Sequence, residues 1–169
     1  VSSILIQIEE ILQNADWFDD SPENKERLNL NVEQKKILSN LSNGSLKVVK
    51  KTYAFLIKNR RKDFLPFMLE VEKRFDDSYF KICNIRLLSS LGERSLQTLR
   101  NYLEFPDREV QRMALEAIAN VKSYKAIRFS LLESYRLGPN FVKSIEKYLS
   151  KWNLEILLKV LQELTEDQD

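Results

Sequence analysis

The sequence predicts an all-α fold, and three observations support that prediction. Its 169 residues include only three glycines and four prolines, too few for the many tight turns of an all-β protein. From residue 45 onward the apolar residues recur at helical spacing, with short polar or glycine-proline breaks between the runs. An apolar fraction of 43% is typical of a globular chain with a substantial core.

The N-terminal quarter is expected to differ from the rest. Five isoleucines and leucines share one helical face between residues 4 and 12, which predicts an amphipathic helix. Residues 15–31 have mixed polarity, a Ser-Pro step and no sustained period, so a loop is expected there. Asn31 followed by Gln34 is typical of a helix start. We interpret residues 1–44 as an N-terminal helical cap with an acidic loop.

Four helical hairpins are predicted in the remainder. The expected helices are 46–59, 62–75, 78–91, 94–104, 108–121, 125–136, 140–151 and 154–165. The first helices share apolar positions 30 to 32 residues apart, namely Val48, Phe80, Val110 and Phe141, and then Leu56, Leu88, Ile118 and Leu149. The second helices share positions 31 residues apart, namely Leu65, Leu96, Ile127 and Leu158.

This period predicts stacked repeats, because each hairpin leaves an apolar face that only a neighbouring hairpin covers. The array is expected over residues 45–169. Its repeats fall near 45–75, 77–105, 107–137 and 138–166.

The third repeat carries a resemblance to a known family. Residues 107–121, DREVQRMALEAIANV, resemble the first helix of the short bacterial HEAT repeats related to phycobilisome lyases. The matching positions are Asp107, Glu109, Val110, Arg112, Ala114, Glu116, Ala117 and Ile118. Larger or polar residues replace the family's small apolar residue in the other repeats, at Thr52, Asn84 and Ile145. The resemblance covers roughly residues 45–165 and implies an α-solenoid, a right-handed superhelix of about four HEAT-like hairpins.

Composition argues against catalysis. The chain has no histidine, the side chain best suited to proton transfer near neutral pH and the commonest metal ligand. Gly-rich phosphate loops, paired cysteine motifs and a nucleophile beside a base are absent from the sequence. We therefore expect no catalytic residue, no cofactor and no metal site, and an enzymatic role is the least favoured of the functions considered.

The single cysteine and the hydropathy of the chain indicate its expected cellular location. Cys83 has no partner for an internal disulfide, which fits a reducing compartment, so a cytoplasmic location is expected. No apolar run approaches the length that crosses a bilayer. Because the first residue is Val1 rather than methionine, the chain is compatible with one domain of a larger protein.

Charge is strongly segregated along the chain. Residues 1–33 carry eight acidic and two basic residues, whereas residues 34–62 carry nine basic residues and no acidic one. Such a block attracts phosphates, acidic proteins or anionic membranes, although a solvated helix face that is partly neutralised by the acidic N-terminal segment is the favoured explanation. The candidate anion-binding residues are Lys47, Lys50, Lys51, Lys58, Arg60, Arg61 and Lys62.

The resemblance also implies a partner-binding face, because the second helices of the family line its concave side. The polar residues on those helices are candidate partner contacts, namely Lys73, Gln97, Arg100, Asn101, Arg128, Glu133, Glu155 and Lys159. In the acidic loop, Trp17 and Phe18 are either a protein-binding anchor or a plug for the first hairpin. Trp152 and Cys83 are expected in the core, since each occupies a periodic apolar position.

The preferred function is a non-catalytic scaffold or adaptor that binds a protein partner. The alternative is an anion-binding module for nucleic acid or acidic membrane that uses residues 34–62. Nucleic acid is disfavoured because the net charge is only +2 and no aromatic residues alternate with the basic residues to stack on nucleotides.

Overall fold

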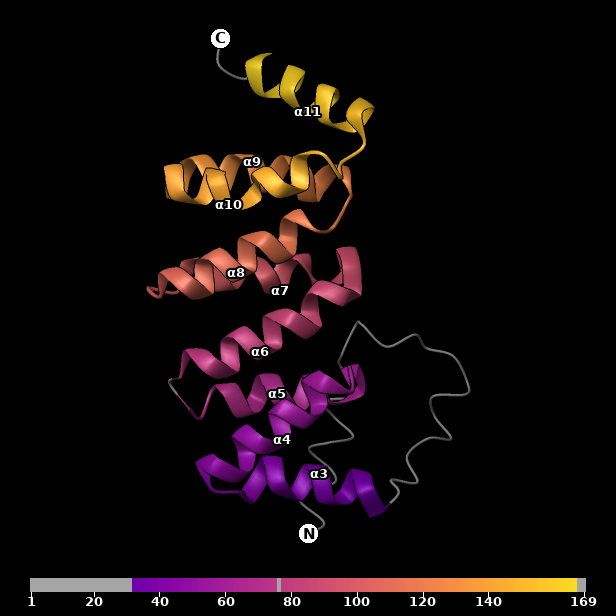
Figure 1. The fold of residues 1–169 in the computed structure, drawn as a ribbon, viewed down its shortest axis with the longest axis vertical. Coiled ribbons are helices and arrows are strands. Elements are labelled where there is room, and N and C mark those ends of the chain that lie inside the picture. Colours follow the sequence, from indigo (N-terminus) through magenta and orange to yellow (C-terminus); the bar gives the residue numbers. More distant parts are fainter. Residues whose placement is uncertain (1–31, 76, 167–169) are drawn as a thin grey trace. The chain divides into compact units, whose positions relative to one another are not determined.

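The computed structural model describes residues 32–75 and 77–166, and every regular element in these ranges is a helix (Figure 1). The predicted all-α class is therefore confirmed for this part of the chain. The predicted helix within residues 4–12 and the aromatic pair Trp17 and Phe18 lie outside the described residues. The α-helices are α3 (Val32–Asn43), α4 (Leu46–Lys58), α5 (Leu65–Glu72), α6 (Ser78–Leu88), α7 (Leu96–Asn101), α8 (Arg108–Ala119), α9 (Tyr124–Leu137), α10 (Pro139–Leu149) and α11 (Leu154–Glu166).

Three 3₁₀ segments adjoin the α-helices. They are η2 (Lys62–Phe64), η3 (Ser89–Ser95) and η4 (Tyr102–Glu104). The α-helices themselves agree with the predicted spans, and each predicted repeat range contains one pair of them. The predicted domain limits at residue 44 and between repeats stay predictions.

Glycines make two of the predicted breaks. Gly138 has a φ of 107° and separates α9 from α10, whose first residue is Pro139. Gly92 has a φ of 64° inside η3. Residues with a Cβ rarely adopt these angles, so the chain turns here at little cost in strain.

The chain divides into two compact units on either side of the bond between Leu87 and Leu88, and we describe each by itself. Unit 1 contains α3, α4, α5 and α6 up to Leu87. Its core forms around Tyr53 of α4, which is fully buried. The Tyr53 ring meets Phe80 of α6 edge-on at 4.7 Å, and its hydroxyl donates to the carbonyl of Met68 in α5 at 2.5 Å. One aromatic side chain thus joins three helices.

Unit 1 accommodates two polar residues at positions where the HEAT-like pattern has small apolar ones. The Thr52 hydroxyl donates to the carbonyl of Val48, 3.0 Å away on the preceding turn. Asn84 is fully buried, and its amide donates to the Glu72 carboxylate at 2.7 Å. The Thr52 hydroxyl is thus satisfied, whereas the amide oxygen of Asn84 is buried without a hydrogen-bond partner among the described residues, so Asn84 is the costlier of the two departures.

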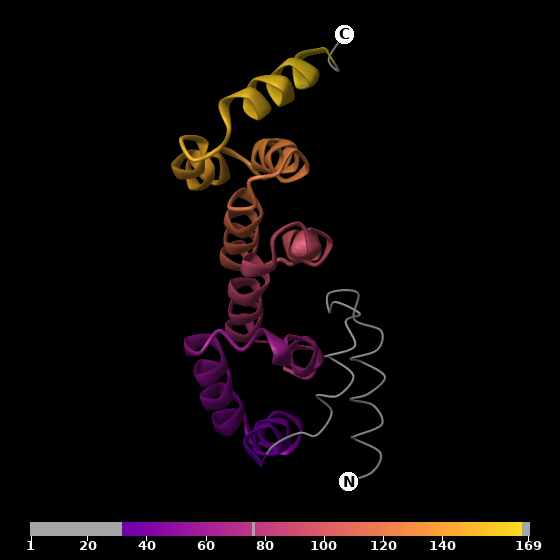
Figure 2. The ribbon, with the colours of Figure 1, turned by 90° about the vertical axis from the view of Figure 1, so that its right-hand side faces the viewer.

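Unit 2 contains η3, α7, η4 and α8 to α11. In Figure 2, α7 and α9 lie on one side of this unit, and α8 and α10 lie on the other. Helix α8 packs against α7, α9 and α10, while α9 also packs against α10 and α11. The inward residues of α8 include Val110, Ala114 and Ile118, each fully buried. These apolar residues form the core between the two sides.

Trp152 follows α10 and is buried, which confirms its predicted place in the core. Its indole nitrogen donates to the carbonyl of Ala119 in α8 at 2.7 Å. Ser130 of α9 interrupts an apolar set, but its buried hydroxyl donates to the Ala126 carbonyl at 2.8 Å.

Three of the periodic positions were wrongly predicted to face inward. Val48 is 38% exposed, and its neighbour Val49 is fully buried instead, although Leu56 of the same helix is buried as predicted. Leu149 and Leu158 are 37% and 58% exposed. In α11 the buried residue is Val160, which lies on the far side of the helix from Leu158 because two residues turn a helix by about 200°.

Among the described residues, no helix has both the length and the apolar character needed to span a membrane.

Candidate binding surfaces

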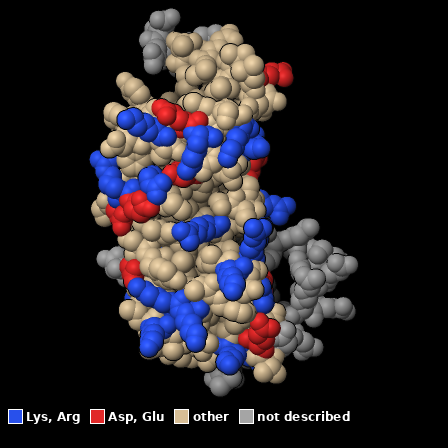
Figure 3. Space-filling model, viewed as in Figure 1, with Lys and Arg blue, Asp and Glu red and all other residues tan. Residues whose placement is uncertain are grey.

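Helix α4 presents a row of lysines to solvent. It carries four lysines and no acidic residue. Lys47, Lys51 and Lys58 are exposed, and no ion pair or hydrogen bond joins them to any described residue. At about 100° per residue they fall within about 40° of one another and extend over about 16 Å of the helix axis. We call these three residues the lysine stripe. Figure 3 shows Lys and Arg side chains gathered on this face of unit 1.

Other members of the predicted basic block are engaged within unit 1. Lys50 pairs with Asp77 at 2.5 Å, and its ammonium lies 5.1 Å from the centre of the Tyr79 ring. Arg61 donates to Asp63 at 2.7 Å and stacks over the Phe64 ring at 4.8 Å.

Two further members of the block follow α4. Arg60 is exposed and has a φ of 50°, so it ends α4 in a left-handed turn, whereas Lys62 is half-buried in η2. Of the seven candidates, the structure brings three together on one helix face.

An apolar ridge runs beside the lysine stripe. Val48 and Phe55 are 38% and 43% exposed, and they lie one above the other because seven residues make nearly two helical turns. Their direction is about 70° from the middle of the lysine stripe. Helix α4 therefore exposes an apolar flank next to a cationic one.

Helix α8 uses its charges differently. Arg112 makes a bidentate pair with Glu109, with donor–acceptor distances of 2.6 and 2.9 Å, and also reaches Glu116 at 2.5 Å. Lys147 of α10 contacts the other oxygen of Glu116 at 2.5 Å. Arg112 lowers the pKa of the Glu109 carboxyl, and the hydrogen bond to Glu116 raises the pKa of the Lys147 amine. These charges neutralise one another inside unit 2.

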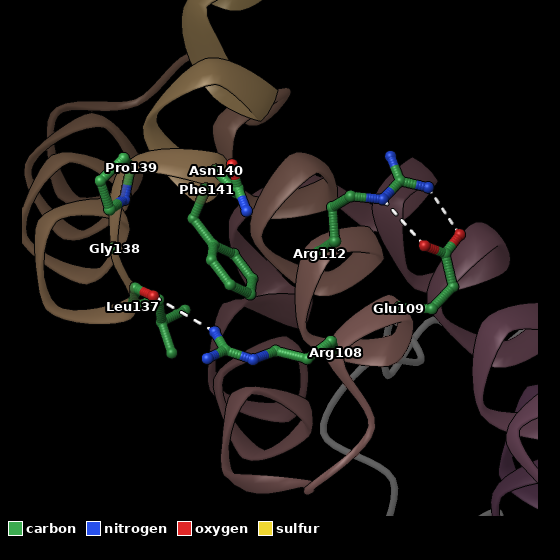
Figure 4. A pocket seen from close by; sticks show the side chains of 8 residues that line it. All are labelled: Arg108, Glu109, Arg112, Leu137, Gly138, Pro139, Asn140 and Phe141. Carbon is green, nitrogen blue, oxygen red and sulfur yellow. Dashed lines mark hydrogen bonds and ion pairs between the residues drawn. The ribbon is translucent and has the colours of Figure 1, made fainter.

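An open cavity of about 530 Å³ lies where the turn between α9 and α10 meets the start of α8 (Figure 4). The Arg108 guanidinium donates to the carbonyl of Leu137 at 3.2 Å and lies over the Phe141 ring at 5.3 Å. Arg112 and Glu109 point toward one another at its edge. The one carboxylate of the lining, Glu109, is held in the ion pair with Arg112, so this cavity offers a polar recess.

The candidate partner contacts are divided between the two units. Lys73 lies in unit 1 and pairs with Glu70 at 2.6 Å. In unit 2, the Arg100 guanidinium of α7 lies 4.1 Å from the Phe129 ring centre of α9. The remaining candidates are Gln97 and Asn101 on α7, Arg128 and Glu133 on α9, and Glu155 and Lys159 on α11.

Several of the candidates in unit 2 already interact with a neighbouring side chain. Glu133 binds Arg136 at 2.6 Å, and the Lys159 amine lies 5.4 Å from the Tyr124 ring centre. Their charges are partly satisfied within the unit.

Sequence reasoning missed two residues on α9. Tyr135 is 86% exposed and Leu132 is 41% exposed. Both lie on the same face as Arg128, at spacings of four and seven residues from it. We call Arg128, Leu132 and Tyr135 the α9 surface. The sequence pattern could have identified Tyr135, because Tyr135 lies on the opposite helical face from the inward residues Ala126 and Ser130.

Cys83 is buried in α6, which confirms its predicted core position. Burial raises the pKa of its thiol, so little of it is the reactive thiolate near neutral pH.

Comparison with known proteins yields no relative. No protein-family model matches the chain, and neither the curated proteins nor the solved structures include a significant match.

Proposed function

We propose that this chain is a non-catalytic scaffold or adaptor domain, built from HEAT-like hairpins, that binds a protein partner through the α9 surface. The observation that carries the proposal is the exposure of Tyr135 and Leu132 beside Arg128. Tyrosine and arginine are over-represented among the residues that dominate protein–protein binding energies, and a largely exposed tyrosine next to a leucine gains from desolvation.

The repeat part of the proposal is supported by contacts between residues about one period apart. Glu116 and Lys147 are 31 residues apart, and Ala119 and Trp152 are 33 residues apart. In stacked hairpins, residues at neighbouring places in consecutive repeats meet in this way. The expected location is a reducing compartment such as the cytoplasm, since the one thiol is buried and unpaired.

A photo-crosslinking experiment tests the proposal. Tyr135 is replaced by benzoylphenylalanine, the full chain is irradiated in a lysate of its native source, and adducts are identified by mass spectrometry. The control carries the same group at Lys143, an exposed residue of α10 on the other side of unit 2.

The proposal predicts a saturable protein adduct from position 135 that is absent from position 143 and is lost when Leu132→Asp is added. Identical adducts from both positions, or adducts insensitive to Leu132→Asp, would contradict it. Circular dichroism of each variant checks that its helical content is unchanged.

A further inference from the structure

The exposed face of α4 has no part in the proposed function of the α9 surface. Three cations without partners among the described residues lie next to an exposed valine and phenylalanine. The four buried residues Val49, Thr52, Tyr53 and Leu56 occupy the opposite side, so the outer face is fixed in its direction by the core.

We propose that this face of α4 is a docking site for an acidic amphipathic helix of a partner protein. Charge complementarity sets the sign of the partner, since α4 has no carboxylate of its own to oppose the lysine stripe. Carboxylates spaced four and seven residues apart on the partner helix match lysines at positions 47, 51 and 58. The partner's apolar residues cover Val48 and Phe55.

The geometry selects a helix over a purely anionic ligand. The apolar ridge and the lysine stripe diverge by about 70° around the α4 axis, an arc that one neighbouring helix covers. Nucleic acid neutralises lysines but gains little from covering an aliphatic side chain such as Val48. A second helix packs about 8–10 Å away and contacts both flanks of α4.

Binding to a defined peptide tests this proposal. The probe is a fluorescein-labelled synthetic helix of about 20 residues, with leucines on one face and glutamates on both flanks, since shorter helices are marginal in water. A second peptide replaces every glutamate with glutamine. Fluorescence anisotropy is measured with the full 169-residue chain at physiological salt.

The glutamate peptide is expected to bind saturably, and the glutamine peptide at least about tenfold more weakly. The combined variant Lys47→Glu, Lys51→Glu, Lys58→Glu should abolish binding, and Phe55→Ser should weaken it severalfold. The matched control Lys122→Glu, Lys143→Glu, Lys151→Glu makes the same change in net charge on exposed residues of unit 2 and should bind normally.

Three results overturn the proposal. Equal loss of binding in the two triple variants would show a response to net charge alone. Full binding by the Phe55→Ser variant would show a purely ionic surface. The third result has two parts: the glutamate peptide fails to bind, and duplex DNA or phosphatidylserine vesicles bind saturably at physiological salt. If the triple variant of the lysine stripe also loses that binding, the stripe is a site for phosphates.

A variant of the α9 surface distinguishes failure of this proposal from failure of the proposed function. The Leu132→Asp variant, which should lose its crosslinked partner, is expected to bind the glutamate peptide with unchanged affinity.

Discussion

Helices α4 and α8 occupy the same place in their predicted repeats, yet they handle charge in opposite ways. On α8, Arg112 and Glu116 join Glu109 and Lys147 in one network of short contacts. On α4, the lysine stripe has no partner among the described residues. The comparison shows that basic residues on a helix face are candidates for binding a partner only where the fold itself does not neutralise them.

The largest expected effect separates the core of α8 from the outer face of α4. Ile118 is fully buried, so Ile118→Asp should lower the free energy of unfolding by about 4 kcal/mol, because an unpaired charge enters the core. Ala54 is exposed on α4, and Ala54→Asp should change the free energy of unfolding by less than about 0.5 kcal/mol. Urea unfolding measures both. An unchanged midpoint for Ile118→Asp would show that the α8 register is wrong.

A smaller effect is expected from the α8 network. Glu116 is only 8% exposed and faces two cations, so Glu116→Gln should cost about 1–2 kcal/mol of unfolding free energy. The control is Glu146→Gln on α10, an exposed residue with no described partner, which should change stability by less than about 0.3 kcal/mol. Urea unfolding measures both variants. Equal losses of unfolding free energy would show that Glu116 contributes no more than an isolated surface charge.

The smallest effect concerns the ion pair that Lys50 of α4 forms with Asp77. The hydrogen bond from Lys50 lowers the pKa of Asp77 below its ordinary value. A carboxyl with a lowered folded-state pKa stabilises the fold above its ordinary pKa, and that contribution disappears as the pH falls through the lowered value. Lys50→Gln should therefore raise the pKa of Asp77 in a carbon-13 NMR titration and flatten the loss of stability on acidification. An unmoved pKa would show that Lys50 does not hold Asp77.

The helices were predictable because their determinants are local. Turn residues such as Gly138 and the helical spacing of apolar residues set the ends of elements within a few positions. The burial of Trp152 was also predictable, because it occupies a periodic position.

Surface assignments were less predictable, because they depend on which neighbour covers a residue. Val48 and Val49 are adjacent valines, and only the packing of α4 on its neighbours decides that Val49 faces inward. The engagement of Lys50 by Asp77 joins α4 to the residue that precedes α6, a contact that the local pattern does not indicate. Tyr135 was overlooked because the expectation from the family resemblance selected polar residues such as Gln97 and Arg128 on the second helices.

Competitive acetylation of lysines tests the central claim most directly, namely that the charges of the lysine stripe are open to a partner and those around α8 are not. Only the neutral amine reacts, and Glu116 raises the pKa of Lys147. With the full chain at neutral pH and limiting reagent, mass spectrometry should find Lys47, Lys51 and Lys58 acetylated roughly threefold or more faster than Lys147, and Glu116→Gln should abolish that difference. Equal rates at Lys51 and Lys147, or protection of the lysine stripe in the isolated chain, would contradict the account.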